Sequence, residues 1–182
     1  SYRGSVYMEI KTDFLILGSG IAGLSMAIKA SSLGTVSVVT KKEKSESNTN
    51  YAQGGIAAVQ ADVDSFDYHI NDTLKCGAGL CREDVVRFTI MEGPERIDEL
   101  VRWGVEFTKA EDRYSTVYDL GKEGGHSKRR VLHAKDLTGR EIERALNEQA
   151  GKQSNIIIYE NFITIDLILE SVVSGGGSGR SR

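Results

Sequence analysis

The stretch "DFLILGSGIAGLSMAIKASSLG", residues 13–34, decides the fold of this chain. Its first apolar run, Phe14–Leu17, predicts a buried strand, and apolar residues at helical spacing follow the glycine turn. We expect that helix to end at Gly34, and the next apolar run, "TVSVVTK" (residues 35–41), to form a second strand. A strand, a helix and a strand in this order predict a parallel, right-handed β-α-β unit.

The glycines of the first turn indicate a nucleotide site. Gly18, Gly20 and Gly23 match the pattern G-x-G-x-x-G between a predicted strand and a predicted helix. Gly18 permits the tight turn, Gly20 lets the backbone approach a diphosphate, and Gly23 lets the helix pack closely on the strand. The start of the helix offers free N–H groups and a positive dipole end to phosphates. The alternative is a tight turn that binds nothing.

The end of the second strand bears on which dinucleotide fits. An NAD site normally has an acidic residue about 20 positions after the turn. This chain has Thr40, Lys41 and Lys42 there, and Glu43 comes too late. The pattern argues against NAD and leaves NADP or a flavin nucleotide.

A second glycine-bearing stretch, "SNTNYAQGGIAAV" (residues 47–59), continues the site. It has no charge from Asn48 to Val59, and apolar residues follow Gly54 and Gly55. A loop placed directly after the second strand lies beside the diphosphate, where its N–H groups can bind the cofactor. The alternative is a solvated surface loop.

Further along the chain, helical and strand-like patterns continue the α/β organisation. Helices are predicted over residues 64–77, 83–93, 94–104 and 138–151, and strands over residues 155–160 and 163–170. Thr138 and Glu141 match a T-x-x-E capping box at the start of the last helix. Pro94 fits the first turn of its helix.

The composition excludes several classes of partner and site. The chain has 182 residues, 40% of them hydrophobic, and a net charge of -3, which argues against nucleic acid as a partner. No apolar run reaches the roughly 18 residues that a membrane helix needs. The two cysteines, Cys76 and Cys81, lack metal-site spacing, so we expect no metal, reduced thiols and a cytoplasmic location.

Five stretches together resemble one family. "GSGIAG", "SNTNYAQGGIAAV", "DTLKCGAGLC", "EGGHSKRRVLHAKDLTGRE" and "NFITIDLIL" occur in this order in L-aspartate oxidases, which are similar to the flavoprotein subunits of succinate dehydrogenase and fumarate reductase. The resemblance covers about residues 13–170. It implies an α/β fold, a Rossmann-like FAD-binding domain with a parallel sheet, truncated and with inserted helices. We expect this partial domain over residues 13–173, after an N-terminal extension (1–12) and before a linker-like tail (174–182).

The resemblance implies FAD as the cofactor. By analogy, the first turn contacts the diphosphate, Lys41 lies beside the adenosine, the second loop lines diphosphate and flavin, and the backbone near Thr164 lies by the adenine. Respiratory relatives attach FAD through a histidine where this chain has Asn48, so noncovalent FAD is implied. The implied cofactor-binding residues are Gly18, Ser19, Gly20, Ile21, Ala22, Gly23, Lys41, Asn48, Thr49, Asn50, Tyr51, Ala52, Gln53, Gly54, Gly55 and Thr164.

The implied reaction is hydride transfer from Cα of L-aspartate to the flavin, which gives iminoaspartate for quinolinate and NAD synthesis. Oxygen or fumarate reoxidises the flavin, and quinolinate synthase is an implied contact. The resemblance also implies that Glu123 orients the substrate by pairing with its ammonium group. His126 and His133 either bind a carboxylate or are structural, and residues 129–130, both arginine, either attract the anionic substrate or pair with nearby acids.

Other functions stay open at this stage. Family members are more than twice as long, and their catalytic arginine lies in parts that this chain lacks, so we expect the isolated chain to be inactive. The alternatives are a relative of fumarate reductase or succinate dehydrogenase, a non-catalytic folded fragment, and an NADP-dependent reductase with Lys41 and Lys42 on the 2′-phosphate.

Overall fold

A parallel sheet forms where three of the predicted strands meet. The computed structural model describes residues 8–41, 49–111, 117–135 and 137–169 of the chain. The sheet contains β1 (Phe14–Leu17), β2 (Val36–Val39) and β6 (Ile156–Tyr159), in the order β1-β2-β6. All pairs are parallel, with Phe14 opposite Val36 and Val36 opposite Ile156. The predicted β-α-β unit is confirmed, and β2 is its central strand.

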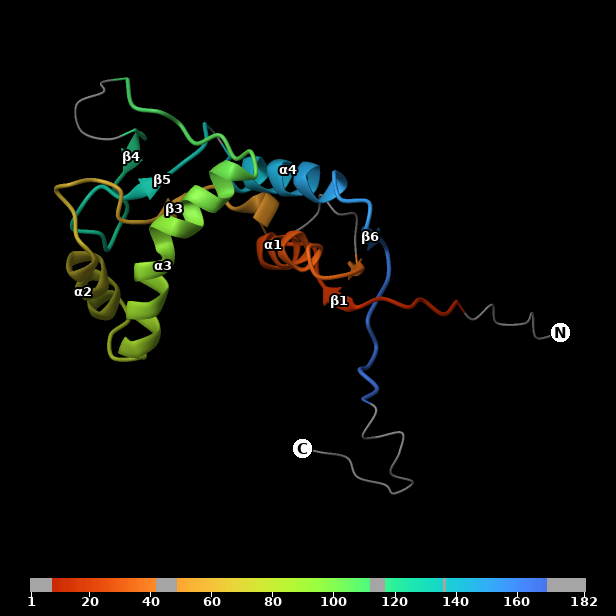
Figure 1. Ribbon diagram of the computed structural model, residues 1–182. Helices are drawn as coiled ribbons and strands as arrows, with labels where there is room; N and C mark the ends of the chain where they lie inside the picture. Colours follow the sequence, from red (N-terminus) through yellow and green to blue (C-terminus); the bar gives the residue numbers. More distant parts are fainter. Residues whose placement is uncertain (1–7, 42–48, 112–116, 136, 170–182) are drawn as a thin grey trace.

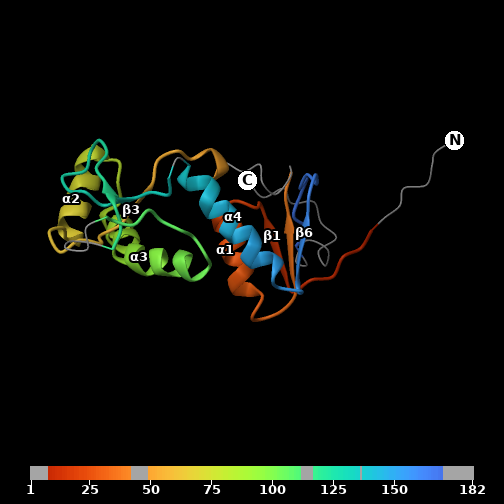
Figure 2. The same cartoon turned by 90° about the horizontal axis from the view of Figure 1, so that it is seen from above.

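Two helices cover one face of this sheet. They are α1 (Ile21–Ala30) and α4 (Thr138–Gly151), which lie side by side against β1 and β6 in Figure 2. Leu24 and Leu146 are fully buried between them. The opposite face carries Leu15 and Ile157, about half exposed at 54% and 52%. Because parallel sheets normally have both faces covered, this open apolar face is unusual.

The first helix ends earlier than the sequence predicts. Its C-cap is Ser31, whose N–H donates to the Ala27 carbonyl at 3.0 Å. Gly34 instead lies against Asp13, where an added Cβ would come within 2.6 Å of the Asp13 carboxylate. That carboxylate accepts hydrogen bonds from the N–H and hydroxyl of Thr35. Close packing, and not helix capping, therefore explains the glycine at position 34.

A second lobe contains the inserted helices and a small antiparallel sheet (Figure 1). The helices are α2 (Phe66–Cys76) and α3 (Glu83–Arg102), and the sheet has the order β3 (Ile56–Ala57), β5 (Val131–Leu132), β4 (Leu120–Gly121). The Ser65 hydroxyl caps α2 by accepting from Tyr68 N–H. One hydrophobic core, which includes Leu24, Leu132 and Leu146, joins the two lobes. The sequence predicts the helices but not this sheet.

The two helices predicted on either side of Pro94 are one continuous helix. Pro94 lies inside α3, where it lacks the N–H that would bind the carbonyl four residues earlier and where its ring crowds that carbonyl. Ile90, Ile97 and Leu100 are buried along one side of α3, across the proline. Burial of this continuous apolar side outweighs the loss of one hydrogen bond, so the prediction of a break was wrong.

The strand predicted over residues 163–170 is also wrong for the residues described. Residues 160–169 contain neither helix nor strand, and Ile165 is 96% exposed. A strand needs a neighbour to bind its backbone N–H and C=O groups, and no described strand pairs with this segment.

The ends of the chain leave the predicted domain limits untested. The boundaries at residues 13 and 173 stay predictions, and residues 174–182 lie outside the described residues. In the part of the chain that is described, no helix has the length and apolar character needed to cross a membrane.

Candidate functional site

The glycine turn after β1 has the geometry that its pattern predicts. Gly18 has φ +106°, which L side chains rarely adopt. A Cβ on Gly23 would overlap the Gly18 carbonyl oxygen, so Gly23 lets α1 approach the turn closely. Gly20 is the N-cap of α1 and offers no side chain to the first turn of the helix. The turn therefore leaves the helix start accessible to an anionic group.

An open groove runs along the ends of β1 and β2. Its volume is about 480 Å³, and it lies at the carboxyl ends of parallel strands, where ligands of open α/β sheets bind. Its lining consists of Leu17, Gly18, Ser19, Gly20, Val39, Thr40, Lys41, Thr49, Phe162, Ile163 and Thr164. The structure thus brings six of the predicted cofactor residues together: Gly18, Ser19, Gly20, Lys41, Thr49 and Thr164. The Ser19 hydroxyl is buried and donates to Thr40 Oγ1 at 3.0 Å.

The second glycine loop lies directly against the first turn. Thr49 begins the short 3₁₀ helix η1 (Thr49–Tyr51), and its hydroxyl accepts a hydrogen bond from Ile21 N–H at 3.1 Å. Ala52 O accepts a hydrogen bond from Gly139 N–H at 3.0 Å, and a Cβ on Gly139 would overlap the Thr49 carbonyl. The loop therefore passes between the start of α1 and the start of α4. Two segments 28 residues apart meet at one crevice.

The remaining predicted cofactor residues lie around this crevice without lining the groove. Ile21, Ala22 and Gly23 form the first turn of α1, and Asn50, Tyr51, Ala52 and Gln53 continue the loop. Tyr51 is 65% exposed. Gly55 packs beneath β5, where a Cβ would overlap the Leu132 carbonyl. Asn48 and the side chain of Asn50 lie outside the described residues.

Glu123 lies at the far end of the second loop. A Cβ on Gly54 would be 3.4 Å from Glu123 Oε1, so the predicted substrate-orienting carboxylate adjoins the predicted flavin loop. Glu123 is exposed and has no hydrogen bond or ion pair through its carboxylate to any described residue. The arrangement leaves this carboxylate available to a cation.

The two arginines after Glu123 are held by other groups. Arg130 is fully buried, and it donates to both Asp64 oxygens at 2.8 Å and to Asp72 Oδ2 at 2.6 Å. Arg129 Nε donates to the Leu120 carbonyl at 2.7 Å. Of the two roles left open for the arginine pair, pairing with nearby acids is the one that Arg130 has. Its burial excludes a role in attracting substrate from solvent.

Burial and the buried Arg130 guanidinium together shift the pKa values of the titratable groups around it. Burial raises the pKa of Asp72, but hydrogen bonds from Ser127 and Arg130 outweigh burial and lower that pKa to about 2. The same balance of burial against hydrogen bonds from Arg130 and Ser65 lowers the pKa of Asp64. Burial, and then the charge of Arg130, lowers the pKa of His69, which favours its neutral imidazole.

Sequence reasoning missed these two aspartates. The partner of Asp64 and Asp72 lies 66 and 58 residues away, so no local pattern marks them. His69, on α2, is buried. His133 Nε2 lies 3.3 Å from Asp119 Oδ2, and neither His126 nor His133 is among the residues that line the groove.

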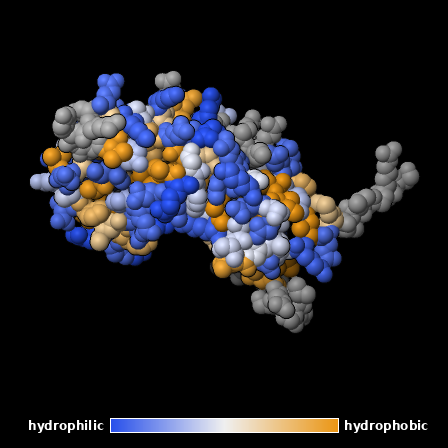
Figure 3. Space-filling view, turned by 45° about the horizontal axis from the view of Figure 1, so that its top comes forward, coloured by the Kyte–Doolittle hydropathy of each residue, from blue (hydrophilic) through white to orange (hydrophobic). Residues whose placement is uncertain are grey.

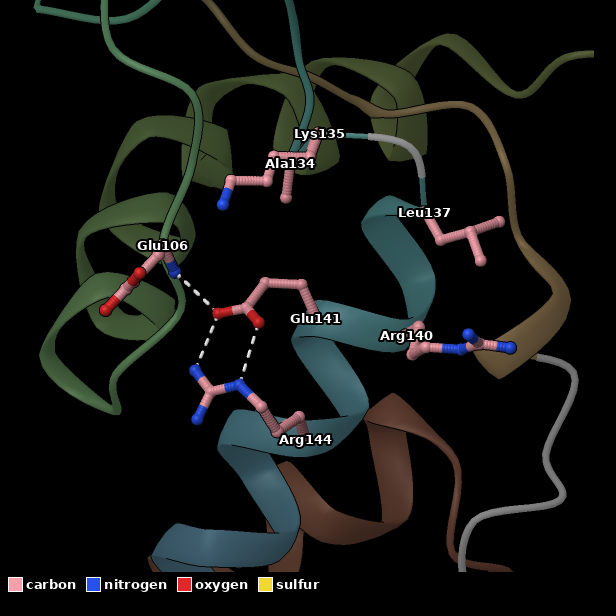
Figure 4. Close-up of a pocket in the computed structure, with 7 residues that line it drawn as sticks. All are labelled: Glu106, Ala134, Lys135, Leu137, Arg140, Glu141 and Arg144. Carbon is pink, nitrogen blue, oxygen red and sulfur yellow. Dashed lines mark hydrogen bonds and ion pairs between the residues drawn. The ribbon is translucent and has the colours of Figure 1, made fainter.

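The predicted capping box at the start of α4 does not form. Leu137 is the N-cap, and Thr138 Oγ1 accepts instead from Ala134 N–H at 3.1 Å. Glu141 accepts from Glu106 N–H at 2.9 Å and pairs with Arg144, as Figure 4 shows. The N–H groups of Ala134 and Glu106, both outside α4, thus take both side chains away from the helix end. Glu141 also lines a separate pocket of about 370 Å³, together with Glu106, Ala134, Lys135, Leu137, Arg140 and Arg144.

Known sequences resemble this chain over most of its length. A family model described as "FAD binding domain" matches residues 13–179. The chain is 51% identical over 156 residues to the chloroplastic L-aspartate oxidase 2-b of Nicotiana tabacum, covering 86% of this chain and 24% of that protein. It is 44% identical over 169 residues to the L-aspartate oxidase of Vibrio cholerae, covering 92% of this chain and 32% of that protein. The chain thus spans about a quarter to a third of these relatives.

Solved structures share the fold. An E. coli quinol fumarate reductase matches with a TM-score of 0.78 at 30% identity, covering 84% of this chain and 26% of that chain. A flavocytochrome c3 fumarate reductase matches with a TM-score of 0.75 at 23% identity, covering 88% of this chain and 28% of that chain, and shows the fold alone.

The described residues fit a dinucleotide such as FAD. The groove is open at the carboxyl ends of two parallel strands, and its floor is the glycine turn. A Cβ added to Gly20 would meet one atom within 4 Å, Thr49 Oγ1 at 3.5 Å, so the backbone there is open to a ligand. The N-terminal end of α1 faces the same region with a partial positive charge. A diphosphate requires this combination of space, backbone donors and positive potential.

Proposed function

Because this chain belongs to the family of FAD binding domains, we propose that it forms the cofactor-binding part of an L-aspartate oxidase. The family match and the named relatives indicate FAD as the cofactor. The observation that carries the proposal is the crevice where Thr49 binds the N-terminal end of α1 and where the same loop leads to Gly54 beside Glu123. This loop would connect the proposed diphosphate site to a carboxylate that has no partner among the described residues.

FAD would be held noncovalently at this site. The turn over residues 18–20 and the N-terminal end of α1, whose Ile21 N–H is held by Thr49, would bind the diphosphate, with Lys41 and Thr164 toward the adenosine end. The loop of residues 48–55 would follow the diphosphate toward the flavin ring. Asparagine at position 48 has no imidazole, so it offers no covalent bond of the kind that histidine provides in respiratory relatives.

Glu123 would orient the amino acid beside the bound cofactor. When bound, the flavin supplies the hydride acceptor for oxidation at Cα of L-aspartate. The Glu123 carboxylate is exposed and unpaired among the described residues, so it can accept hydrogen bonds from the substrate ammonium group. Succinate and fumarate carry no ammonium group, and Glu123 therefore favours the amino acid over these substrates.

The remaining proposals concern the whole protein. Iminoaspartate would be the product, oxygen or fumarate would reoxidise the flavin, and quinolinate synthase would be the consumer of the product and a contact partner. The two cysteines, both free, favour the cytoplasm. The named plant relatives are chloroplastic, so imaging of the tagged protein tests the compartment.

Turnover by the complete protein tests the proposal. We expect oxidation of L-aspartate but not of succinate, and release of intact FAD on denaturation, identified by mass spectrometry. Release of NADP would favour the reductase alternative. Turnover of succinate alone would favour a relative of fumarate reductase, the class of the matching E. coli structure.

Substitution of Glu123 tests its role directly. In Glu123→Gln, kcat/KM for L-aspartate should fall by one to two orders of magnitude, because a hydrogen bond to a charged group contributes about 1.5–3 kcal/mol. Bound FAD should stay unchanged. The control is Glu111→Gln, an exposed carboxylate that lies away from the groove lining. Equal activity of both variants would remove Glu123 from the mechanism.

A further inference from the structure

The carboxylate of Glu123 stands on a turn whose shape depends on glycine. His126 N–H donates to the Glu123 carbonyl at 3.2 Å, and Gly125, at the third position, has φ +84°. A type II turn requires positive φ at this position. Glu123 is therefore the first residue of the turn and His126 the last, so the orientation of the turn sets the direction of the Glu123 side chain.

One carboxylate oxygen of α2 holds the segment that follows this turn. Asp72 Oδ2 accepts from Ser127 N–H at 2.7 Å, from the Ser127 hydroxyl at 2.8 Å and from Arg130 Nη1 at 2.6 Å. Asp72 thus binds the loop at two places, directly after the turn and where β5 begins. These contacts cross from a helix to a loop 55 residues away in sequence.

Arg130 extends the same anchor to the far end of the turn. Its fully buried guanidinium uses Nε and Nη2 for Asp64 and Nη1 for Asp72, and Nη1 also lies 3.2 Å from His126 Nδ1. A guanidinium can only donate, so His126 Nδ1 must accept and the imidazole proton must lie on Nε2. The cluster therefore fixes the backbone after the turn and also the tautomer of its last residue.

We propose that Asp72 is a positioning residue for the substrate, acting through Ser127 and Arg130 on the turn that carries Glu123. This inference rests on the proposed function, in which Glu123 binds the substrate ammonium group. Charge-assisted hydrogen bonds are short and directional, so they restrict the loop better than neutral ones. Because catalysis is sensitive to misplacement of about 1 Å, loss of this anchor should reduce turnover without loss of cofactor.

Variants of Ser127 in the complete, FAD-loaded protein test the inference. Ser127→Ala removes one of the three hydrogen bonds to Asp72 from an exposed position, so the fold should be kept. We expect kcat/KM for L-aspartate to fall about tenfold, with the Kd for FAD unchanged within about twofold. Ser127→Thr keeps the hydroxyl and should keep wild-type activity. Asp72→Asn should give a larger loss, and Asp62→Asn, an exposed acid nearby, should give none.

A double variant separates positioning from a general structural effect. If Ser127 acts through Glu123, then Ser127→Ala should cause no further loss in a Glu123→Gln background, whereas independent effects would multiply. Trypsin gives a second readout, because release of the loop should speed cleavage after Lys128 in Ser127→Ala but not in Asp62→Asn.

The outcomes distinguish the two proposals. Wild-type kinetics in both Ser127→Ala and Asp72→Asn, with Glu123→Gln impaired, would overturn the positioning role and leave the proposed function standing. Multiplicative losses in the double variant would also overturn it. Failure of the wild-type protein to oxidise L-aspartate would overturn the proposed function and this inference together.

Discussion

Gly23 shows how one missing methyl group sets the geometry of the site. A Cβ there would overlap the Gly18 carbonyl oxygen, which belongs to backbone and cannot swing away. Gly23→Ala should therefore destabilise the chain by about 2–3 kcal/mol, as overpacking does, and weaken FAD binding by moving α1 off the turn. Urea unfolding and quenching of flavin fluorescence measure the two effects.

The matched control for this variant is Gly151→Ala, at the end of α4. A Cβ there meets no atom within 4 Å, and alanine favours helix, so stability should stay equal or rise by about 0.5 kcal/mol. Equal stability of the Gly23 and Gly151 variants would show that close contact between α1 and the turn is not required.

Residues whose roles are local could be predicted from the sequence, and residues with distant partners could not. The requirements at Gly18 and Gly23 arise within one turn, and the structure meets both. Asp64 and Asp72 look like ordinary surface acids until Arg130 is brought to them from another segment. The capping box predicted from Thr138 and Glu141 does not form for the same reason, because both side chains bind partners outside the helix.

At the scale of elements, Glu141 joins α4 to the segment after α3. A hydrogen bond from Arg144 lowers the pKa of Glu141, burial raises it, and the Glu106 N–H lowers it further, with a net lowering. The folded state therefore holds its proton less tightly than the unfolded state. The stability from Glu141 should be fully present above about pH 4.5 and lost as the pH falls through the lowered value.

The variant Glu141→Gln should cost about 1–2 kcal/mol at pH 7, and its difference from wild type should shrink toward pH 3. Urea unfolding at several pH values measures this. Glu148→Gln is the control, since Glu148 pairs with the same Arg144 at 2.9 Å but has a side chain that is 60% exposed. A cost for Glu141→Gln that stays constant down to pH 3 would contradict the linkage.

Element type could be predicted for α1 and for the three strands of the parallel sheet, but not for the two-residue strands, for the helix around Pro94 or for residues 163–169. The buried spacing of α1 and the apolar runs of β1, β2 and β6 each determine their elements. β3, β4 and β5 have two residues each, too few for any period to show. Pro94 was misread as a boundary, because the cost of one hydrogen bond is visible in sequence and the packing of α3 is not.

For the whole molecule, the fold class follows from the order of the elements along the chain, but which faces of the sheet are covered does not. A strand, a glycine turn, a helix and a strand require the parallel unit that the structure contains. Whether both faces of the sheet are covered depends on what packs there. Among the described residues, only one face is covered by helices, and Figure 3 shows apolar patches on both lobes.

This open face should make the isolated chain self-associate. Leu15 and Ile157 flank Ser37 on the face opposite α1 and α4, and both are about half exposed at 54% and 52%. Apolar area of this kind contributes about 25 cal/mol per Å² when it is removed from water, so two copies gain by covering it. Sedimentation velocity should show concentration-dependent dimers or larger species at micromolar concentration.

The double variant Leu15→Lys with Ile157→Lys should sediment as a monomer, since two cations on a small face oppose its burial against a second copy. The control is Leu33→Lys with Leu80→Lys, two positions that are more exposed, at 78% and 93%, but lie off the sheet. If the sheet face drives association, only the first pair should abolish it. Loss of association in the control pair would instead assign it to scattered apolar surface, and a monomeric wild-type chain would contradict the prediction.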